Sequence, residues 1–266
     1  GNDCLYASTD VDKTIIIGAD ACTQVLTSAA DGTIAIGFSA LTLLTSGTNN
    51  TVVGYQAADA MTSANYNTAF GYQALSAETE GHAATAFGDR ALGLQNKGSD
   101  ANTQNVGLGF FAGYNNVTGT NNTYVGFEAG KGGTGNNTSN TGIGKDAMLS
   151  ITTGDNNVAV GRSCGDALTD GDGNAFFGVN AGGTTTSAQE VTALGYQAAG
   201  AGNMTTAAKG TVAIGFNSLV SLTSGIGNVA IGSGSLATED TGDKNTAVGT
   251  AALANQNRDG TVGNTA

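Results

Sequence analysis

One glycine recurs along the whole chain and sets the register of an internal repeat. Counting from Gly1, there are 15 such glycines and 14 spacings, of which ten equal 17 residues and the others lie between 18 and 21. A fixed period of this kind is typical of repeat architectures, in which each unit packs on its neighbours. After Gly1, the register glycines are Gly18, Gly37, Gly54, Gly71, Gly88, Gly109, Gly126, Gly144, Gly161, Gly178, Gly195, Gly215, Gly232 and Gly249.

The residues around this glycine are also repeated. Taking it as position 0, position −1 is apolar wherever it exists, position −2 is usually Ala, and position +3 is always Ala, Ser or Cys. Position +4 is often Leu, and a Gly, Asn, Thr and Asp-rich stretch follows. Alternation along a strand puts positions −3 and −1 on one face and position −2 on the other. We expect the aliphatic residues at −3 and −1 to be buried.

The repeat predicts β-structure, because no helical pattern of 10–12 residues fits between the glycines. Each unit is interpreted as two short strands that bend at the register glycine and are closed by a turn-rich loop. Such a unit cannot bury its apolar side alone, whereas stacked units can. We therefore expect an all-β parallel β-solenoid of about 15 repeats with a modal period of 17 residues. The absence of proline agrees, since each turn donates backbone N–H groups to its neighbour.

The repeat begins and ends in mid-unit. Residues 1–5 match the second half of a repeat, and Asn264, Thr265 and Ala266 match the start of another. No capping segment is present, although solenoids need polar caps. These observations predict that residues 1–266 form a single continuous array and are a fragment of a longer fibre.

Charge and composition exclude some classes of partner. The net charge is −12 with nine basic residues in 266, so no basic patch for nucleic acid is expected. No apolar run approaches the ~20 residues of a membrane span, so we expect no membrane insertion. Three cysteines make neither a disulfide framework nor a metal site.

The small residues at positions −2 and +3 suggest that another backbone approaches closely. An identical chain around a shared axis would explain them, and a narrow monomeric solenoid with a tight interior is the alternative. On the first interpretation, Ala69→Glu or Ala74→Glu would block assembly.

Three runs carry a resemblance to known repeats: NTAFGYQAL at residues 67–75, TVAIGFNSL at 211–219 and NVAIGSGSL at 228–236. They resemble the head repeats of trimeric autotransporter adhesins and are even more similar to repeat regions of phage tail fibres. The resemblance implies a left-handed β-roll that forms a homotrimer. It also implies an extracellular, non-enzymatic fibre of a virion or cell surface that attaches to a surface glycan or protein receptor.

The position after the register glycine is the main candidate site, because it holds seven of the 16 aromatic residues. Stacked rings there could bind sugar rings or a receptor, or they could pack along the coil or against a neighbouring chain. The residues are Phe38, Tyr55, Tyr72, Phe110, Phe127, Tyr196 and Phe216.

The histidine, the Asp-rich loop and the cysteines suggest no catalytic or metal-binding site. His82 is the only histidine and is expected to be an exposed loop residue. The run from Asp170 to Asn174 lacks the glycine and glutamate of a calcium loop. Cys4 and Cys164 are expected to be packed thiols, and a Cys4–Cys22 disulfide is disfavoured. We expect no catalytic residue, metal or cofactor.

Four alternative functions stay open. They are a bacterial trimeric adhesin, a self-assembling extracellular filament, an ice-binding solenoid and a polysaccharide-depolymerising tailspike. Ice binding would use the threonines at position −3, although their alternation with Val and Ile favours a core. A polysaccharide-depolymerising tailspike would need Asp or Glu side chains from different turns to lie close together. The threonines are Thr51, Thr68, Thr85, Thr123, Thr141, Thr192 and Thr246.

Overall fold

The computed structural model describes residues 12–27, 30–257 and 263–266 and divides into two compact units, Gly1–Asn136 and Asn137–Ala266. Cys4, and with it the expectation about a Cys4–Cys22 disulfide, lies outside the described residues. The first unit contains β1 (Ile15–Ile17), β2 (Ile34–Ile36), β3 (Thr51–Val53), β4 (Thr68–Phe70), β5 (Thr85–Phe87), β6 (Val106–Leu108) and β7 (Thr123–Val125). The second contains β8 (Thr141–Ile143), β9 (Val158–Val160), β10 (Ala175–Phe177), β11 (Thr192–Leu194), β12 (Val212–Ile214), β13 (Val229–Ile231) and β14 (Thr246–Val248).

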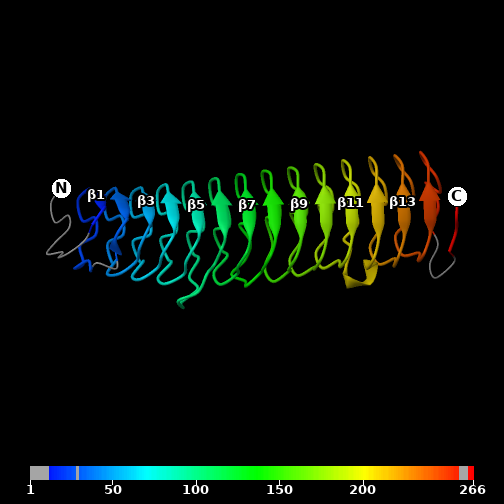
Figure 1. Cartoon of the computed structure of the whole chain (residues 1–266). Coiled ribbons are helices and arrows are strands. Elements are labelled where there is room, and N and C mark those ends of the chain that lie inside the picture. Colours follow the sequence, from blue (N-terminus) through cyan, green and yellow to red (C-terminus); the bar gives the residue numbers. More distant parts are fainter. Residues whose placement is uncertain (1–11, 28–29, 258–262) are drawn as a thin grey trace. The chain divides into compact units, whose positions relative to one another are not determined.

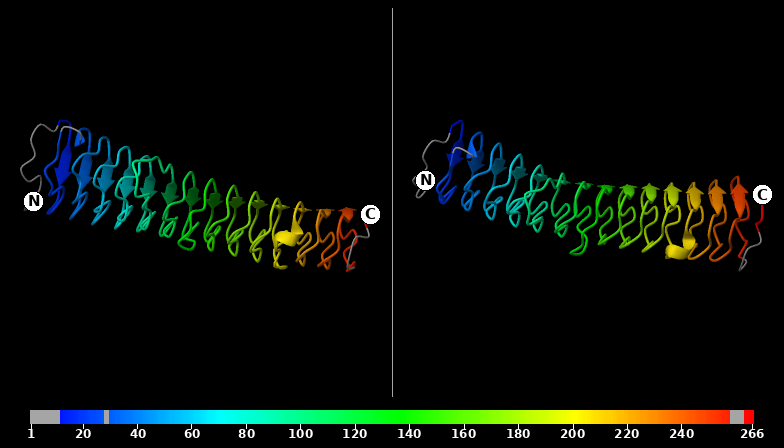
Figure 2. Two further views of the ribbon diagram at one scale, coloured as in Figure 1. Left: turned by 90° about the horizontal axis from the view of Figure 1, so that it is seen from below. Right: turned by 60° about the horizontal axis from the view of Figure 1, so that its bottom comes forward.

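Within each unit, successive strands pair in parallel and in the register of the repeat. Thr68 of β4 pairs with Thr85 of β5, and Val212 of β12 pairs with Val229 of β13. Figure 1 shows the strands of each unit side by side, joined by loops at both ends. A 3₁₀ turn, η2 (Thr206–Ala208), lies in the loop between β11 and β12 and is drawn in yellow in Figure 2. The predicted parallel β-solenoid is confirmed, with about 14 turns.

Each turn has one strand, so the prediction of a second strand after the glycine is wrong. The residues at positions +2 and +4 have left-handed backbone; φ is 50° at Gln73 and 56° at Leu75. This alternation aims backbone N–H groups in opposite directions along the coil. The Gln73 N–H donates to the Tyr55 carbonyl of the preceding turn (2.9 Å), and the Leu75 N–H donates to the Ala91 carbonyl of the next (3.0 Å). The segment therefore stacks on both neighbours without being an extended strand.

Two constraints explain why the register residue is glycine. At Gly54, φ is +150°, a conformation that L-residues rarely adopt. A Cβ built there would lie 2.1 Å from the carbonyl oxygen of Gly71 in the next turn. Close stacking and backbone conformation therefore both exclude a side chain.

The coil interior is lined by positions −2, +3 and +4. Ala69, Ala74 and Leu75 are completely buried within the single chain. The small residues are therefore explained by the narrow interior of a single coil, which was the alternative to close approach by a second chain. They therefore supply no argument for a second chain.

A column of buried asparagines at position −4 lines another part of the interior. The Asn67 backbone N–H donates to Asn50 Oδ1 (3.0 Å), and Asn67 Nδ2 donates to the carbonyl of Gly81 (3.0 Å). In the second unit, the Asn174 backbone N–H donates to Asn157 Oδ1 (2.9 Å). Each amide thus joins consecutive turns and leaves few buried polar groups unpaired. The column was not recognised in the sequence.

Two buried glutamates occupy position +7, where aliphatic residues usually stand. Glu78 Oε1 accepts from the backbone N–H of Gly81 (2.8 Å), and its Oε2 accepts from Gln95 Nε2 (3.0 Å). Glu239 repeats the arrangement with Gly242 (2.7 Å) and Gln256 (3.2 Å). A Glu followed 17 residues later by a Gln is therefore a hydrogen-bonded pair inside the coil.

Candidate binding surfaces

The outer side of the strands is apolar, contrary to the prediction that positions −3 and −1 are buried. Alternation directs the small residue at −2 inward and its two neighbours outward, as the exposure of Phe70 (42%) and Phe87 (48%) shows. We call positions −3, −1 and +1 the apolar sheet face. Its most exposed residues are Ile15, Ile17, Phe38, Tyr55, Phe70, Tyr72, Phe87, Leu108, Phe110 and Phe127 in the first unit and Ile143, Phe177, Leu194, Tyr196, Phe216, Ile231 and Val248 in the second.

The aromatic residues at position +1 stack on one another along the coil. Ring centroids are 5.2 Å apart for Phe38 and Tyr55, and 5.4 Å apart for Tyr55 and Tyr72. Phe110–Phe127 (5.2 Å) and Tyr196–Phe216 (5.5 Å) are similar pairs, again with nearly parallel planes. Each of these rings therefore has at least one face covered by a neighbouring ring, and Tyr55 is stacked on both sides.

A second aromatic stack was missed in the sequence. Phe70 and Phe87, at position −1, have ring centroids 4.9 Å apart and planes 9° from parallel. This position was expected to lie in the core, so its rings were not considered as a surface feature.

The apolar sheet face is large for a monomer. In the first unit, ten of its side chains are 40–58% exposed. At roughly 200 Å² per large apolar side chain, they expose about 900 Å² in total, divided between the strand residues at −3 and −1 and the residues at +1 beyond the bend at the register glycine. The largest patch on a typical monomer is ~300–600 Å², whereas each partner in a standard interface contributes ~800 Å². Among the described residues of this face in the first unit, only Asp89 is charged.

Shallow grooves lined by both polar and apolar side chains run beside the aromatic column, along positions +2, +5 and +6. The Asp59 groove, in the first unit, has a volume of about 330 Å³. The Asp166 groove, at the equivalent place in the second unit, has a volume of about 350 Å³. The Asp59 groove is lined by Ser39, Thr42, Leu43, Gln56, Asp59 and Ala60, and the Asp166 groove by Ser163, Asp166, Asn180, Gly183, Thr184, Gln197, Gly200 and Ala201.

Each groove contains one partly buried carboxyl group. Burial raises the pKa of Asp59, although a hydrogen bond from its own backbone N–H opposes the shift. Burial also raises the pKa of Asp166, against hydrogen bonds from its own backbone and that of Ala167; the negative charge of Asp146 adds a smaller upward shift. In the described part of the chain, no side chain pairs with either carboxyl group.

Large side chains fill the equivalent positions later in the first unit. The guanidinium of Arg90 lies 5.4 Å from the ring centroid of Phe111, and the ammonium of Lys131 lies 5.2 Å from the same ring. The ring of Tyr114 meets Phe111 edge-on at 4.6 Å. In this part of the first unit, large side chains at +2 and +5 thus fill the space that the two grooves occupy where those residues are smaller.

His82 is only 13% exposed, so the prediction of an exposed loop residue is wrong. Its Nδ1 accepts from the backbone N–H of Asn65 (2.9 Å), and its Nε2 pairs with Asp100. Because Nδ1 accepts, the proton of the neutral ring lies on Nε2 and is donated to Asp100. His82 thus holds the longest inserted loop against the coil. A shallow pocket of about 440 Å³ beside it is lined by Ser46, Thr48, Ser63, Asn65, Glu80 and Asp100.

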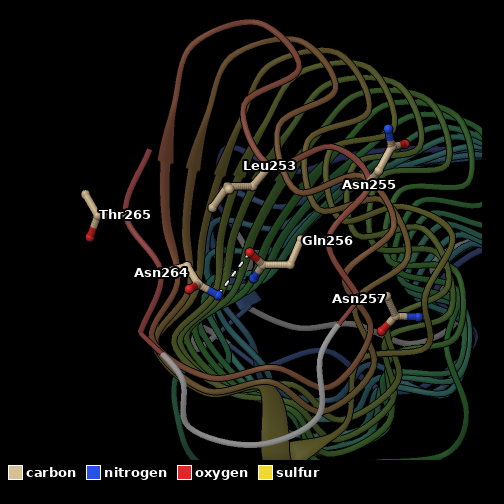
Figure 3. Close-up of a pocket in the computed structure, with 6 residues that line it drawn as sticks. All are labelled: Leu253, Asn255, Gln256, Asn257, Asn264 and Thr265. Atoms are coloured by element: carbon tan, nitrogen blue, oxygen red, sulfur yellow. Dashed lines mark hydrogen bonds between the residues drawn. The ribbon is translucent and has the colours of Figure 1, made fainter.

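A pocket of about 400 Å³ near β14 is the interior of the coil seen end-on. Figure 3 shows Leu253, Gln256 and Asn264 pointing into it, while Asn255 and Asn257 point away. Asn264 Nδ2 donates to Gln256 Oε1 (3.0 Å). Thr265 pairs with Thr246 as a parallel bridge, in the register that the repeat predicts. Leu253, Gln256 and Asn264 occupy the interior positions +4, +7 and −4 described above.

The remaining chemical candidates are structural. Asn174 belongs to the asparagine column, and Asp172 Oδ1 accepts from the backbone N–H of Asp155 (2.8 Å). The described residues contain no group of three or more His, Cys, Asp or Glu that could hold a metal ion. Cys22 and Cys164 are buried, and burial raises the pKa of the Cys164 thiol to about 12. Within the described ranges, no helix is long and apolar enough to cross a membrane.

These features define the class: a parallel β-solenoid with one three-residue strand per turn, an apolar outer sheet face and shallow grooves beside it. Comparison with protein-family models and with curated protein sequences finds no match.

Proposed function

We propose that this chain is a non-enzymatic segment of an extracellular surface fibre, of a virion or a cell, that assembles as a homotrimer and serves attachment to a host or surface receptor. The apolar sheet face is the observation that carries the proposal. About 900 Å² of exposed apolar surface in the first unit is unfavourable in water and is of the size that one partner contributes to a stable interface. The resemblance of the repeats to tail fibres and trimeric adhesins supports the trimer.

A second copy is the occupant that fits this face best. Residues of the face recur once per turn, at the ~4.8 Å spacing of parallel strands. Only a partner with the same spacing can pack its side chains between those of every turn. An identical chain has that spacing, and it needs no charged complement on a face that carries almost no charge.

The oligomeric state tests the proposal. Sedimentation velocity of the wild-type chain should show a trimer. The double variant Phe70→Thr/Phe87→Thr removes two exposed rings but keeps residues that favour strands, and it should shift the chain to monomer. Tyr66→Thr is the matched control, since Tyr66 is 63% exposed outside the apolar sheet face. A wild-type chain that stays monomeric at tens of micromolar would overturn the proposal.

Ice binding is the alternative that one observation favours. The threonines at position −3 lie on the outer face, so the argument that placed them in a core is wrong. Val, Ile and Ala interrupt that column, and aromatic rings project beside it. Thermal hysteresis with ice shaping would favour this alternative over the fibre, and release of reducing ends from a capsular polysaccharide would favour the depolymerising tailspike.

A further inference from the structure

We infer that the Asp59 groove and the Asp166 groove are binding sites for a neutral, hydroxyl-rich saccharide. The inference rests on the attachment function proposed above and names the place and chemistry of that attachment. It differs from sugar binding on the aromatic column, where each ring has at least one face covered by a neighbouring ring. A sugar ring packs on an aromatic face, so stacking reduces the surface that the column offers to it.

The polar groups in the two grooves match hydroxyl groups. In the Asp59 groove, the carboxyl group of Asp59 and the amide of Gln56 come from one turn and the hydroxyl of Thr42 from the preceding turn. Gln56 Oε1 already accepts from Gln73 Nε2 (3.1 Å), which leaves Gln56 Nε2 to donate. Thr42 Oγ1 donates to the Ser39 carbonyl (2.8 Å), which leaves Thr42 Oγ1 to accept. In the Asp166 groove, Asn180 and Gln197 supply two amides from the next turns. Amides both donate and accept hydrogen bonds, as sugar hydroxyls do. Their recurrence at ~4.8 Å intervals suits a polymer of repeating units.

The charge of the chain favours a neutral ligand. The net charge is −12, and each groove adds a carboxyl group, so an anionic saccharide would be repelled. A cationic ligand would find one carboxyl group in each groove, whereas the uncharged amide and hydroxyl groups there are more numerous and suit an uncharged, hydroxyl-rich partner.

Two glycines give the Asp166 groove its space, for different reasons. A Cβ at Gly200 would lie 2.5 Å from the carbonyl oxygen of Asn180, so glycine is required there by packing. A Cβ at Gly183 would lie 3.2 Å from the same oxygen and 3.5 Å from Asp166 Oδ1, so an alanine could be accommodated at a small cost. Gly183 therefore keeps the groove open where the fold would admit a side chain.

The test uses the full chain and saturation-transfer NMR with three neutral probes: maltohexaose, cellohexaose and chitohexaose. Oligomers of hyaluronan serve as the anionic comparison. At least one neutral probe should bind, and the hyaluronan oligomers should not. Binding by none of the three at 10 mM, or stronger binding of hyaluronan, would overturn the inference.

Variants locate the site. Asp59→Tyr and Asp166→Tyr together introduce, at position +5, the residue that fills the groove at Tyr114, and they should weaken binding at least tenfold. Asp170→Tyr is the matched control, because Asp170 is exposed in the same unit and outside the groove. Retained circular dichroism and melting temperature would show that the variants fold. Unchanged binding by the folded double variant would also overturn the inference.

Two further readouts separate the outcomes. Asp59→Asn with Asp166→Asn keeps the shape and hydrogen bonding, so binding should stay within about threefold of wild type, whereas a large loss would point to ion pairing and contradict a neutral ligand. Sedimentation velocity of the same samples reports assembly independently. If the chain is a trimer but binds no neutral probe, saccharide binding in the grooves is refuted and the proposed fibre assembly stands. If the chain is a monomer that binds a neutral probe, only the proposed trimer is refuted.

Discussion

The register glycine shows how one residue type can satisfy two requirements at once. Its φ lies where side chains are strained, and its Cα faces a carbonyl oxygen of the next turn. Both requirements exclude any residue that has a Cβ atom, whatever its polarity or size, so only glycine fits. This is why the glycine recurs while the residues around it vary within a class.

Gly54→Ala should destabilise the fold by about 3 kcal/mol or more, because the methyl group would meet the Gly71 carbonyl oxygen at 2.1 Å on a backbone of φ +150°. Urea denaturation followed by circular dichroism measures the loss. Gly210→Asn is the control: Gly210 has φ +68° with no atom within 4 Å, and Asn tolerates left-handed backbone. Equal losses in both variants would contradict the role given to close stacking.

The groove carboxyl groups predict a pH dependence with a definite sign. The pKa values of Asp59 and Asp166 are raised in the folded state, so the folded chain holds these protons more strongly than the unfolded chain. Their contribution to stability is therefore present at acidic pH and is lost as pH rises from ~4 through the raised pKa values. Asp59→Asn should stabilise the chain at pH 7 by on the order of 0.5 kcal/mol, allowing for solvent screening.

Thermal denaturation from pH 3 to 8 checks this expectation. The difference in melting temperature between wild type and Asp59→Asn should grow with pH and then level off. Asp31→Asn serves as a control for the general effect of removing one negative charge. A variant that is less stable than wild type at pH 7 would show that ionised Asp59 stabilises the fold.

At the scale of the element, the short strand and the turn after it both supply hydrogen bonds between stacked turns. The strand pairs through three residues, and the left-handed positions of the turn extend the hydrogen bonding to both neighbouring turns. Asparagine amides at −4 add side-chain bonds inside the coil. A turn of about 17 residues is thereby held by more than its strand.

Asn157→Ala should cost about 2 kcal/mol of stability. It removes hydrogen bonds to the carbonyl of Gly171 (2.7 Å) and from the backbone N–H of Asn174 (2.9 Å), and it leaves both groups buried without that partner. Urea denaturation measures the change, and Thr153→Ala, at an exposed position in the preceding loop, is the control. A loss no greater than that of the control would mean that water replaces the amide.

The alanine substitutions must also be reinterpreted at this scale. Ala69 and Ala74 are completely buried in the coil of a single chain. A glutamate at either position would have to enter the chain's own interior, so we now expect misfolding of the monomer rather than a folded chain that fails to assemble. These variants therefore cannot report on the trimer, and the exposed rings of β4 and β5 are the better targets.

At the scale of the whole molecule, acidic charge and apolar surface are separated. The net charge of −12 favours repulsion between chains, whereas the proposed contact between copies uses a face on which, among the described residues, Asp89, Lys145 and Arg162 are the charged ones. Association should therefore be driven by apolar burial. Salt that screens charge should not weaken it.

Raising NaCl from 0.05 to 1 M should leave the sedimentation coefficient of the assembled chain unchanged or raise the trimer fraction. Screening reduces the repulsion between acidic chains, and apolar burial does not depend on ion pairs. The Phe70→Thr/Phe87→Thr variant should remain monomeric throughout. Dissociation of the wild-type chain by salt would show that ion pairs hold the copies together.

Much of the architecture can be predicted from the glycine spacing. Parallel stacking, the register of pairing and the place of each strand follow from a period of 17 and from the apolar residue before each glycine. The turn after the glycine was misassigned, because alternating left-handed residues such as Gln73 and Leu75 have no clear signal in residue type. The grooves could not be predicted either, since they depend on which side chains of separate turns fill the same space.

Alternation along the chain was enough to divide the strand residues into two faces, but it did not show which face lies inside. That depends on the width of the coil. A turn of 17 residues with a single short strand encloses little space, so position −2 is Ala in most strands, or a single buried ring at Tyr124 and Phe176, and the residues at −3 and −1 remain outside. The order of the turns was thus determined by the local repeat in the sequence. Which side chains form the outer surface was determined only by the tertiary structure, because it depends on how much space the coil encloses.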